Sequence, residues 1–435
     1  MTLPNSEKSS AQASPTALPP IAQVPALWTF VGLVAGLVGG LTVAFFAPEG
    51  LPLITTWVQP IGEMWLRGLQ ATIVPLVAAL LFTGVTQAVA MASAGAMARR
   101  SLGMFLGFLA FSAGISLLVT PALLTLLPVP AEAGAALRTS LVAAPTGPVP
   151  GVAEFLRSIV PTNVIDAAAN DRMLPLILFM SVFALAVGRL ARPQREVMTT
   201  FFAALASAML VVIGWVLALA PLGVFALSMA VAATSGIAAI GALAHYVIIV
   251  VLTGSVVLIA GYVFAVVIAR QPLGAFARAM LPVQTIALST QSSLASLPAM
   301  LGACRKLGVR ETTSEFVMPL AVALFRATSP AMNLAVAIYV AHLYGVTLTP
   351  MLMFSAWVVA ILVSLSSVSL PGSISFVASV GPIAIAMNAP LAPLALLVAV
   401  EVLPDLMRTL GNVTLDVAVT SAVDRRSRRS PEATI

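Results

Sequence analysis

Apolar runs of roughly membrane-spanning length recur along most of the chain. A transmembrane helix needs about 20 mostly apolar residues. Runs of about that length occur at roughly 27–47, 64–92, 101–127, 174–191, 199–233, 241–269, 315–345 and 391–423. Charged residues make up only 8% of the sequence, whereas a soluble domain carries about 25%. The sequence therefore predicts an all-α polytopic membrane protein with eight transmembrane helices.

The basic residues are distributed unevenly between the two sides of this predicted bundle. Lys and Arg usually mark cytoplasmic loops. If the N-terminus is cytoplasmic, most basic residues fall on that side, and Arg67 and Arg138 are the main exceptions. We expect a bacterial-type cytoplasmic membrane, with a disordered N-tail (1–26) and a basic C-tail (424–435) both in the cytoplasm. The net charge of +6 then reflects membrane topology rather than nucleic-acid binding.

Two serine-rich segments, 276–308 and 355–390, do not fit as simple spans. The first has basic residues at both ends, so it must enter the membrane and return to the same side. Their centres resemble each other, with SSLASLP at 292–298 and SSVSLPG at 366–372. The segments are predicted to be re-entrant hairpins that enter from opposite faces, each followed by a span, as in an inverted repeat. The alternative is that Ser and Gly merely allow close helix packing.

Charged residues cluster in EVLPDLMRTLGNVTLD at 401–416, inside the last predicted span. On a helix of 3.6 residues per turn they occupy about a quarter of the circumference. A charged residue at the bilayer centre costs about 2.5–3.5 kcal/mol, so this stripe must face protein or water. Two interpretations of the stripe remain: a substrate site, or an internal ion-pair network. The second is possible because Arg408 lies one turn from Asp405. The stripe consists of Glu401, Asp405, Arg408, Thr409, Asn412 and Asp416.

Several segments resemble one family of carriers. They are PTNVIDAAANDRMLPLILF at 161–179, LAPLGVFAL at 219–227, FVMPLAVAL at 316–324 and the acid-x3-D-x2-R-T-x2-N-x3-D spacing of the last span. Over residues 27–423 the chain resembles the dicarboxylate/amino acid:cation symporters, the glutamate-transporter homologues.

The resemblance implies a single membrane domain that works as an elevator in a homotrimer. It implies eight spans, two opposed hairpins and inverted repeats. The scaffold would comprise about 27–92 and 174–233, and the transport core about 101–127 and 241–423.

The resemblance also assigns roles within the last span. Arg408 would bind the side-chain carboxylate of the substrate and Asp405 its α-amino group. Thr409 and Asn412 would add hydrogen bonds, and Asp416 would help to coordinate sodium. Further substrate positions are Ser292, Ser293, Ser329, Leu370, Pro371 and Gly372, and further ion-coupling positions are Glu401, Ser364 and Ser367.

The family's sodium-binding motif N-M-D-G-T is absent from the seventh span. The positions of its Asn, Met and Asp hold Phe325, Arg326 and Ala327. A hard cation prefers oxygen ligands, which Phe and Ala side chains lack. We hypothesise that Arg326, paired with Asp416, replaces a coupling ion. Coupling to protons, or no coupling, is then favoured over sodium, with Glu401 or Asp405 as proton carrier. The alternative is a change of helix packing that keeps sodium coupling through other ligands.

Charge also favours one substrate class. A C4-dicarboxylate offers no cation to Asp405 and would be repelled by it, whereas aspartate or glutamate offers an ammonium group. The sequence thus predicts a secondary active transporter of an acidic amino acid, with a C4-dicarboxylate symporter as the alternative.

Two other functional classes are less favoured. An anion channel needs no site that closes from both sides, so the opposed hairpins favour a carrier. For an enzyme, the sequence lacks HExxH, GxSxG, Walker and His–acid patterns. Its one cysteine excludes an intrachain disulfide or a Cys-rich metal site, and no cofactor is expected. His245 and His342 are predicted near the outer ends of spans, as interfacial residues.

Overall fold

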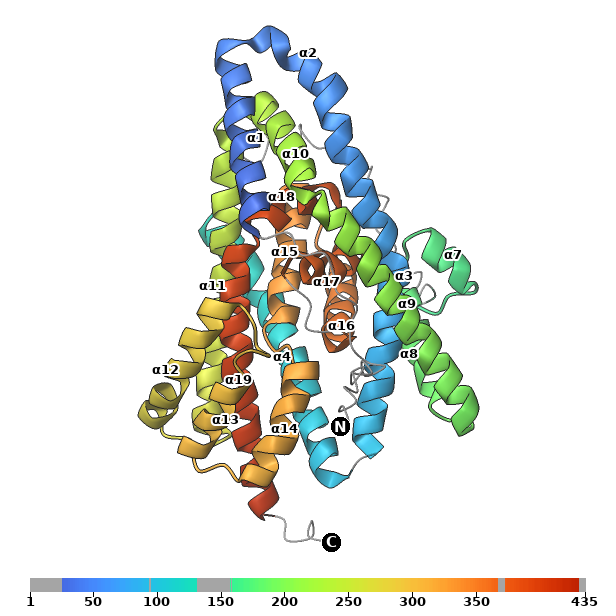
Figure 1. The fold of residues 1–435 in the computed structure, drawn as a ribbon, viewed down its shortest axis with the longest axis vertical. Coiled ribbons are helices and arrows are strands. Elements are labelled where there is room, and N and C mark those ends of the chain that lie inside the picture. Colours follow the sequence, from blue (N-terminus) through green and yellow to red (C-terminus); the bar gives the residue numbers. More distant parts are fainter. Residues whose placement is uncertain (1–25, 94, 131–156, 158, 367–371, 430–435) are drawn as a thin grey trace, which may run out of the picture.

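The computed structural model describes residues 26–429 except 94, 131–156, 158 and 367–371. This part of the chain is helical and contains no strand (Figure 1). A 3-10 turn (Pro48–Gly50) and a π turn (Ile54–Val58) flank the short helix α2. The helices are α1 (Ala26–Phe46), α2 (Leu51–Leu53), α3 (Gln59–Ser93), α4 (Ala96–Leu126), α7 (Val164–Ala169), α8 (Met173–Val187), α9 (Arg192–Ala218), α10 (Ala220–Ser235), α11 (Ala238–Val267), α12 (Leu273–Thr290), α13 (Leu297–Lys306), α14 (Glu311–Leu324), α15 (Ser329–Leu343), α16 (Pro350–Ser366), α17 (Gly372–Ala386), α18 (Ala392–Val400) and α19 (Val402–Arg429).

Glycines bring α1 and α10 into backbone contact. Gly32, Gly36 and Gly40 follow one another at four-residue spacing, which places them on one face of α1. A Cβ at Gly32 would lie 2.4 Å from the carbonyl oxygen of Pro221, and one at Gly40 would lie 2.3 Å from that of Met229. Small residues at such spacing let membrane helices pack closely. The pair forms one end of the molecule, while α8 and α9 pack along α3 (Figure 1).

The run predicted as one span at 199–233 is two helices. α9 ends at Ala218 and α10 begins at Ala220. Pro221 lacks a backbone N–H and its ring crowds the preceding turn, so an uninterrupted helix cannot pass through it without strain. The break separates their contacts, because α9 packs mainly on α3 whereas α10 packs mainly on α1.

The two predicted hairpins are pairs of helices. α12 and α13 form the first and meet at a turn that opens with Gln291 at φ 50°. α16 and α17 form the second. The first hairpin packs against α19 and the second against α15 and α3. α19 and α11 lie side by side, and α12 and α13 lie toward the C-terminal end of α19 (Figure 1).

The last two predicted spans are interrupted. Residues 325–328 separate α14 from α15, and Glu401 separates α18 from α19. α19 also continues to Arg429, so part of the predicted tail at 424–435 is helical.

Within the described residues, six helical stretches are long and apolar enough to cross a membrane. The predicted spans at 174–191 and 391–423 are not among them. α8 has only 15 residues, and α19 carries the charged stripe.

Candidate substrate and ion site

The charged stripe of α19 is buried inside the bundle. Arg408 is 2% exposed, and Asp405 has the largest exposed fraction of the six stripe residues, 9%. α11 and α14 pack along the same helix, as do both helices of the first hairpin. The stripe therefore faces protein. This agrees with the high free-energy cost of exposing charged side chains to lipid. Its members are Glu401, Asp405, Arg408, Thr409, Asn412 and Asp416.

The Arg408 guanidinium holds two carboxylates. Its Nη1 lies 2.8 Å from Asp405 Oδ1 and its Nη2 lies 2.6 Å from Glu401 Oε1. Nη2 also donates to Asn333 Oδ1 at 3.3 Å, and the Tyr246 hydroxyl donates to Glu401 Oε2 at 3.2 Å. The pairing of Arg408 with Asp405 follows the helical spacing, whereas the contacts from Tyr246 and Asn333 come from distant parts of the sequence. With two carboxylates and one guanidinium, the cluster has a formal charge of −1.

The break between α14 and α15 is tied to α19 through Thr328. The backbone N–H of Thr328 donates to Asn412 Oδ1 at 3.0 Å. Its hydroxyl lies 2.7 Å from the same oxygen and 2.8 Å from the carbonyl oxygen of Arg408. A Cβ at Gly411 would lie 2.1 Å from Cγ2 of Thr328, so the two segments meet closely there. Thr328 was not among the predicted site residues. The hint in the sequence is Gly411, a glycine among the polar stripe residues, which allows another segment to approach α19 closely.

Phe325, at the position of the Asn in the family's sodium-binding motif, has aromatic surroundings. Phe325 is fully buried and stacks on Phe105, with ring centroids 4.8 Å apart, and meets Phe108 edge-on at 5.9 Å. Arg326 and Asp416 attract each other electrostatically. None of the ion pairs between described residues joins Arg326 to Asp416. The direct pairing of these two side chains therefore remains a hypothesis.

Several buried polar atoms of the predicted site lack a hydrogen-bond partner among the described residues. Buried polar groups are normally satisfied, so each exception asks for an explanation such as a bound ligand, ion or water. Glu401 Oε1 belongs to this set although it is in ion-pair contact with Arg408. The other site atoms are Ser329 Oγ, Ser364 Oγ, Arg408 Nε and Asp416 Oδ1. This concentration fits a site that a polar ligand completes.

The remaining predicted residues lie as follows. The Thr409 hydroxyl donates to the Asp405 carbonyl oxygen at 2.9 Å. At the first hairpin tip, Ser292 and Ser293 are half-buried, and the Ser292 hydroxyl accepts from the N–H of Ala295 at 3.2 Å. No hydrogen bond or ion pair between described residues joins this tip to Arg408. Gly372 begins α17, and the predicted positions Ser367, Leu370 and Pro371 lie outside the described residues.

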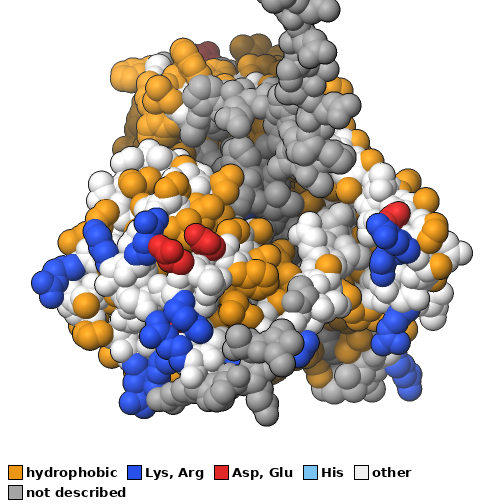
Figure 2. Space-filling view, turned by 60° about the horizontal axis from the view of Figure 1, so that its bottom comes forward, with side chains coloured by type: hydrophobic (Ala, Val, Ile, Leu, Met, Phe, Trp, Pro, Cys, Tyr) orange, Lys and Arg blue, Asp and Glu red, His pale blue; other side chains and the backbone are white. Residues whose placement is uncertain are grey.

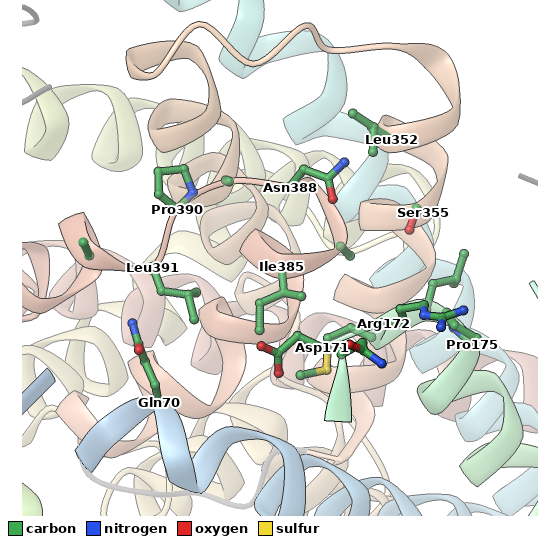
Figure 3. Close-up of a pocket in the computed structure, with 16 residues that line it drawn as sticks. Gln70, Asp171, Arg172, Pro175, Leu352, Ser355, Ile385, Asn388, Pro390 and Leu391 are labelled. Atoms are coloured by element: carbon green, nitrogen blue, oxygen red, sulfur yellow. The ribbon is translucent and has the colours of Figure 1, made fainter. Parts of the chain in front are cut away.

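A separate cavity of about 600 Å³ lies between α3, the α7–α8 connection and the base of the second hairpin. Gln70 enters it from α3, and Asp171 and Arg172 from the connection before α8 (Figure 3). Ser355 on α16 and Asn388 after α17 line the opposite side. None of the predicted substrate residues that the structure describes lines this cavity.

The helical fold and the buried charged stripe define a multi-pass membrane transporter. Polar groups converge inside an apolar bundle, where the α14–α15 break meets α19, and groups buried there cannot serve solubility. The chain belongs to the sodium:dicarboxylate symporter family, whose sequence model matches residues 26–426. It is therefore a transporter and not an enzyme, and the resemblance seen in its motifs is confirmed.

Curated relatives cover most of the chain. The proton/sodium-glutamate symport protein of Bacillus subtilis is 27% identical over 392 residues, which are 88% of each chain. The proton/glutamate-aspartate symporter of Escherichia coli is 30% identical over 274 residues, 60% of each chain. The C4-dicarboxylate transport protein of Rhizobium etli is 24% identical over 420 residues, 91% of this chain and 88% of its own.

Proposed function

We propose that this protein is a secondary carrier that moves an acidic amino acid, aspartate or glutamate, by alternating access. The observation that carries the proposal is the buried Arg408 beside Asp405, with an unsatisfied guanidinium N–H. A guanidinium binds carboxylate through two parallel hydrogen bonds. A neighbouring carboxylate suits the ammonium group of the same substrate. Relatives named for glutamate and aspartate transport support this substrate class.

Transport of a C4-dicarboxylate is the second candidate. It is favoured by the relative from Rhizobium etli and by the ion pair that partly neutralises Asp405 in this conformation. Against it, a substrate that draws Arg408 away would leave the Asp405 charge without a partner, because a dicarboxylate brings no cation. An amino acid brings its own.

We infer that coupling uses protons rather than sodium. The aromatic packing of Phe325 offers no oxygen at the position where the family motif has Asn. The side-chain oxygen of Asn412 is already bonded by Thr328. Arg326 adds a guanidinium that interacts electrostatically with Asp405 and Asp416. Together these features support a site where a guanidinium stands in for a metal ion and a carboxylate of the stripe carries the proton.

The proposed setting is a bacterial-type cytoplasmic membrane, with both termini cytoplasmic and the chain in a homotrimer that moves as an elevator. Lys and Arg side chains gather on the face at the C-terminal end of α19 (Figure 2). Basic residues favour the cytoplasmic side, which supports this orientation. Exposed members on the described helices and their connections include Arg189, Arg195, Arg270, Arg305 and Lys306.

Uptake by proteoliposomes tests the proposal. We expect saturable uptake of labelled aspartate that an inward proton gradient drives and that persists when choline replaces sodium. Arg408→Ala should weaken substrate binding by about 100-fold, or about 3 kcal/mol, because it leaves a substrate carboxylate unpaired. The matched control is Arg305→Ala, an exposed arginine on α13 that should leave uptake unchanged.

Three results would count against parts of the proposal. A strict sodium requirement would overturn proton coupling. Saturable uptake of succinate without uptake of aspartate would show that the substrate is a C4-dicarboxylate and not an acidic amino acid. Flux that rises linearly with concentration, with no counterflow, would indicate a channel.

A further inference from the structure

The cavity of about 600 Å³ between α3, the α7–α8 connection and the second hairpin has two walls of different origin. Cavities of about 300–1,000 Å³ typically hold small molecules. One wall lies on the side of the predicted scaffold and includes Gln70 and residues 170–175. The other belongs to the predicted core and includes Leu352, Ser355 and most of residues 385–392 (Figure 3). A ligand in this cavity would therefore touch both parts of the carrier.

Asp171 makes the cavity electronegative. Its carboxylate takes part in none of the ion pairs between described residues. The adjacent Arg172 is paired with Asp166, whose Oδ1 also accepts from Asn170 Nδ2 at 2.8 Å. With two carboxylates and one guanidinium, this corner of the cavity has a formal charge of −1. A cationic ligand is therefore favoured.

The backbone turns on both walls carry polar side chains where glycine is the usual residue. Asp171 (φ 54°) and Asn388 (φ 55°) are both in the left-handed region, which costs free energy for a residue with a Cβ. Each follows the end of a helix, α7 or α17, where such a turn commonly has Gly. Both side chains line the cavity (Figure 3). The last turn of α17 lines it as well, and a helix C-terminus carries partial negative charge. These groups add acceptors to the charge of Asp171.

The lining of the cavity selects among cations. A metal ion needs several oxygen ligands at about 2.0–2.6 Å, whereas this large cavity is lined by one unpaired carboxylate. An organic ammonium group can pair with Asp171 and donate to the amide oxygens of Gln70 and Asn388. An amino acid with two carboxylates would be repelled by Asp171, so the transported substrate is not expected here. The apolar side chains of the lining suit an apolar ligand body, and they include Met173, Leu352 and Leu391.

We propose that this cavity binds a small organic ammonium ion with an apolar body, and that the bound ion slows transport by holding the core against the scaffold. The second part rests on the proposed elevator carrier. Because the two walls belong to parts that move past each other in that carrier, the cavity keeps this form only in the present arrangement. A ligand shifts such an equilibrium by the difference in its affinity for the two states. Inhibition is therefore non-competitive with the substrate at Arg408.

Three indole compounds of similar size test the class of ligand. Tryptamine carries an ammonium group, tryptophol has a hydroxyl group in its place, and indole-3-propionate has a carboxylate. Titration of the melting temperature of the purified protein gives the dissociation constant of each compound, because a ligand that binds the folded state stabilises it. We expect tryptamine to bind about tenfold more tightly than tryptophol, since its hydrogen bond to Asp171 joins two charged groups. Indole-3-propionate should not bind.

Asp171→Asn is the variant that tests the site itself. It keeps the shape of the side chain and removes its charge, so tryptamine should bind about tenfold more weakly. The affinity for tryptophol should stay unchanged, which also reports that the variant is folded. The matched control is Glu196→Gln, which removes a carboxylate of α9 that does not line the cavity, and this variant should bind all three compounds as the wild type does. If Asp171→Asn binds tryptamine as tightly as Glu196→Gln, the proposed site is wrong.

Aspartate uptake into proteoliposomes tests the consequence for transport. Tryptamine should lower the maximal rate of the wild-type protein without changing the aspartate concentration that gives half of that rate, and Asp171→Asn should need about tenfold more tryptamine for the same effect. Inhibition that excess aspartate overcomes would put the amine in the substrate site and overturn the proposal. Binding that depends on Asp171 but leaves uptake unchanged would overturn the effect on transport. If the wild-type protein takes up no aspartate, the proposed function is wrong, whereas the melting-temperature titrations still decide whether the cavity binds the amine.

Discussion

Asp424 shows how a single carboxylate fastens one end of the molecule. It lies on the last turns of α19, beyond the apolar part of that helix. It accepts hydrogen bonds from Arg310 Nε at 2.6 Å, Thr313 Oγ1 at 2.9 Å and Arg428 Nε at 2.8 Å. Burial alone would raise the pKa of this carboxyl, but these hydrogen bonds hold it below its usual range. Asp424 thereby joins α19 to the start of α14.

We expect Asp424→Asn to destabilise the purified protein by about 1–2 kcal/mol at neutral pH, since both arginines are half-exposed and solvent weakens their bonds. Because folding lowers the pKa of Asp424, its contribution is complete above the unfolded pKa of about 4 and is lost as pH falls through the folded value. The difference in melting temperature between variant and wild type should thus stay constant from about pH 5 upward and shrink in stronger acid. A difference that grows on acidification would contradict this assignment.

At the scale of elements, the crossing of α19 with the α14–α15 break depends on one methyl group. A Cβ at Gly411 would lie 2.1 Å from Cγ2 of Thr328. We therefore expect Gly411→Ala to cost about 1–3 kcal/mol through overpacking. Thr328→Ser removes that methyl group but keeps the hydroxyl that faces Asn412. The double variant should regain most of the stability that Gly411→Ala loses, as measured by melting temperature.

The departure from additivity of the two substitutions decides whether the contact between Gly411 and Thr328 causes the loss of stability. If the two substitutions prove additive, strain between Gly411 and Thr328 is not what destabilises the single variant. Aspartate exchange by the double variant is a second readout, because Asn412 is a predicted substrate residue. Exchange should recover together with stability.

The sequence predicted the apolar runs, the two hairpins and the charged stripe, because each leaves a local pattern of hydropathy, serine content or helical spacing. The interruption at Leu219 was not predicted, because the apolar run continues past it, although Pro221 marks it in the sequence. The interruption at Glu401 lies beside Pro404, which lacks a backbone N–H and so removes a hydrogen bond of the helix there. The groups around Arg408 likewise include one that the sequence predicted and one that it did not. Asp405 is one turn away and was foreseen. Tyr246 comes from a helix far earlier in the chain, and only the packing of α11 on α19 brings it there.

At the scale of the whole molecule, α3 of the predicted scaffold touches the second hairpin of the predicted core. A Cβ at Gly381 on α17 would lie 2.9 Å from Cδ1 of Ile73 on α3. The cavity described above lies between the same two parts. If the core moves as an elevator past the scaffold, this contact must break in every transport cycle, whereas a rigid bundle with local gates would keep it.

A disulfide across this contact distinguishes the two mechanisms. We expect the variant Ile73→Cys/Gly381→Cys, with the single native Cys304 replaced by Ser, to stop both net uptake and exchange of aspartate when oxidised. Reduction should restore both, because a disulfide holds its two Cα atoms within about 4.4–6.8 Å and thus prevents sliding. Aspartate binding to the oxidised protein should persist, since neither residue belongs to the Arg408 cluster. Each single-cysteine variant controls for the substitutions. If fully cross-linked protein still transports aspartate at the reduced protein's rate, the core does not move past the scaffold.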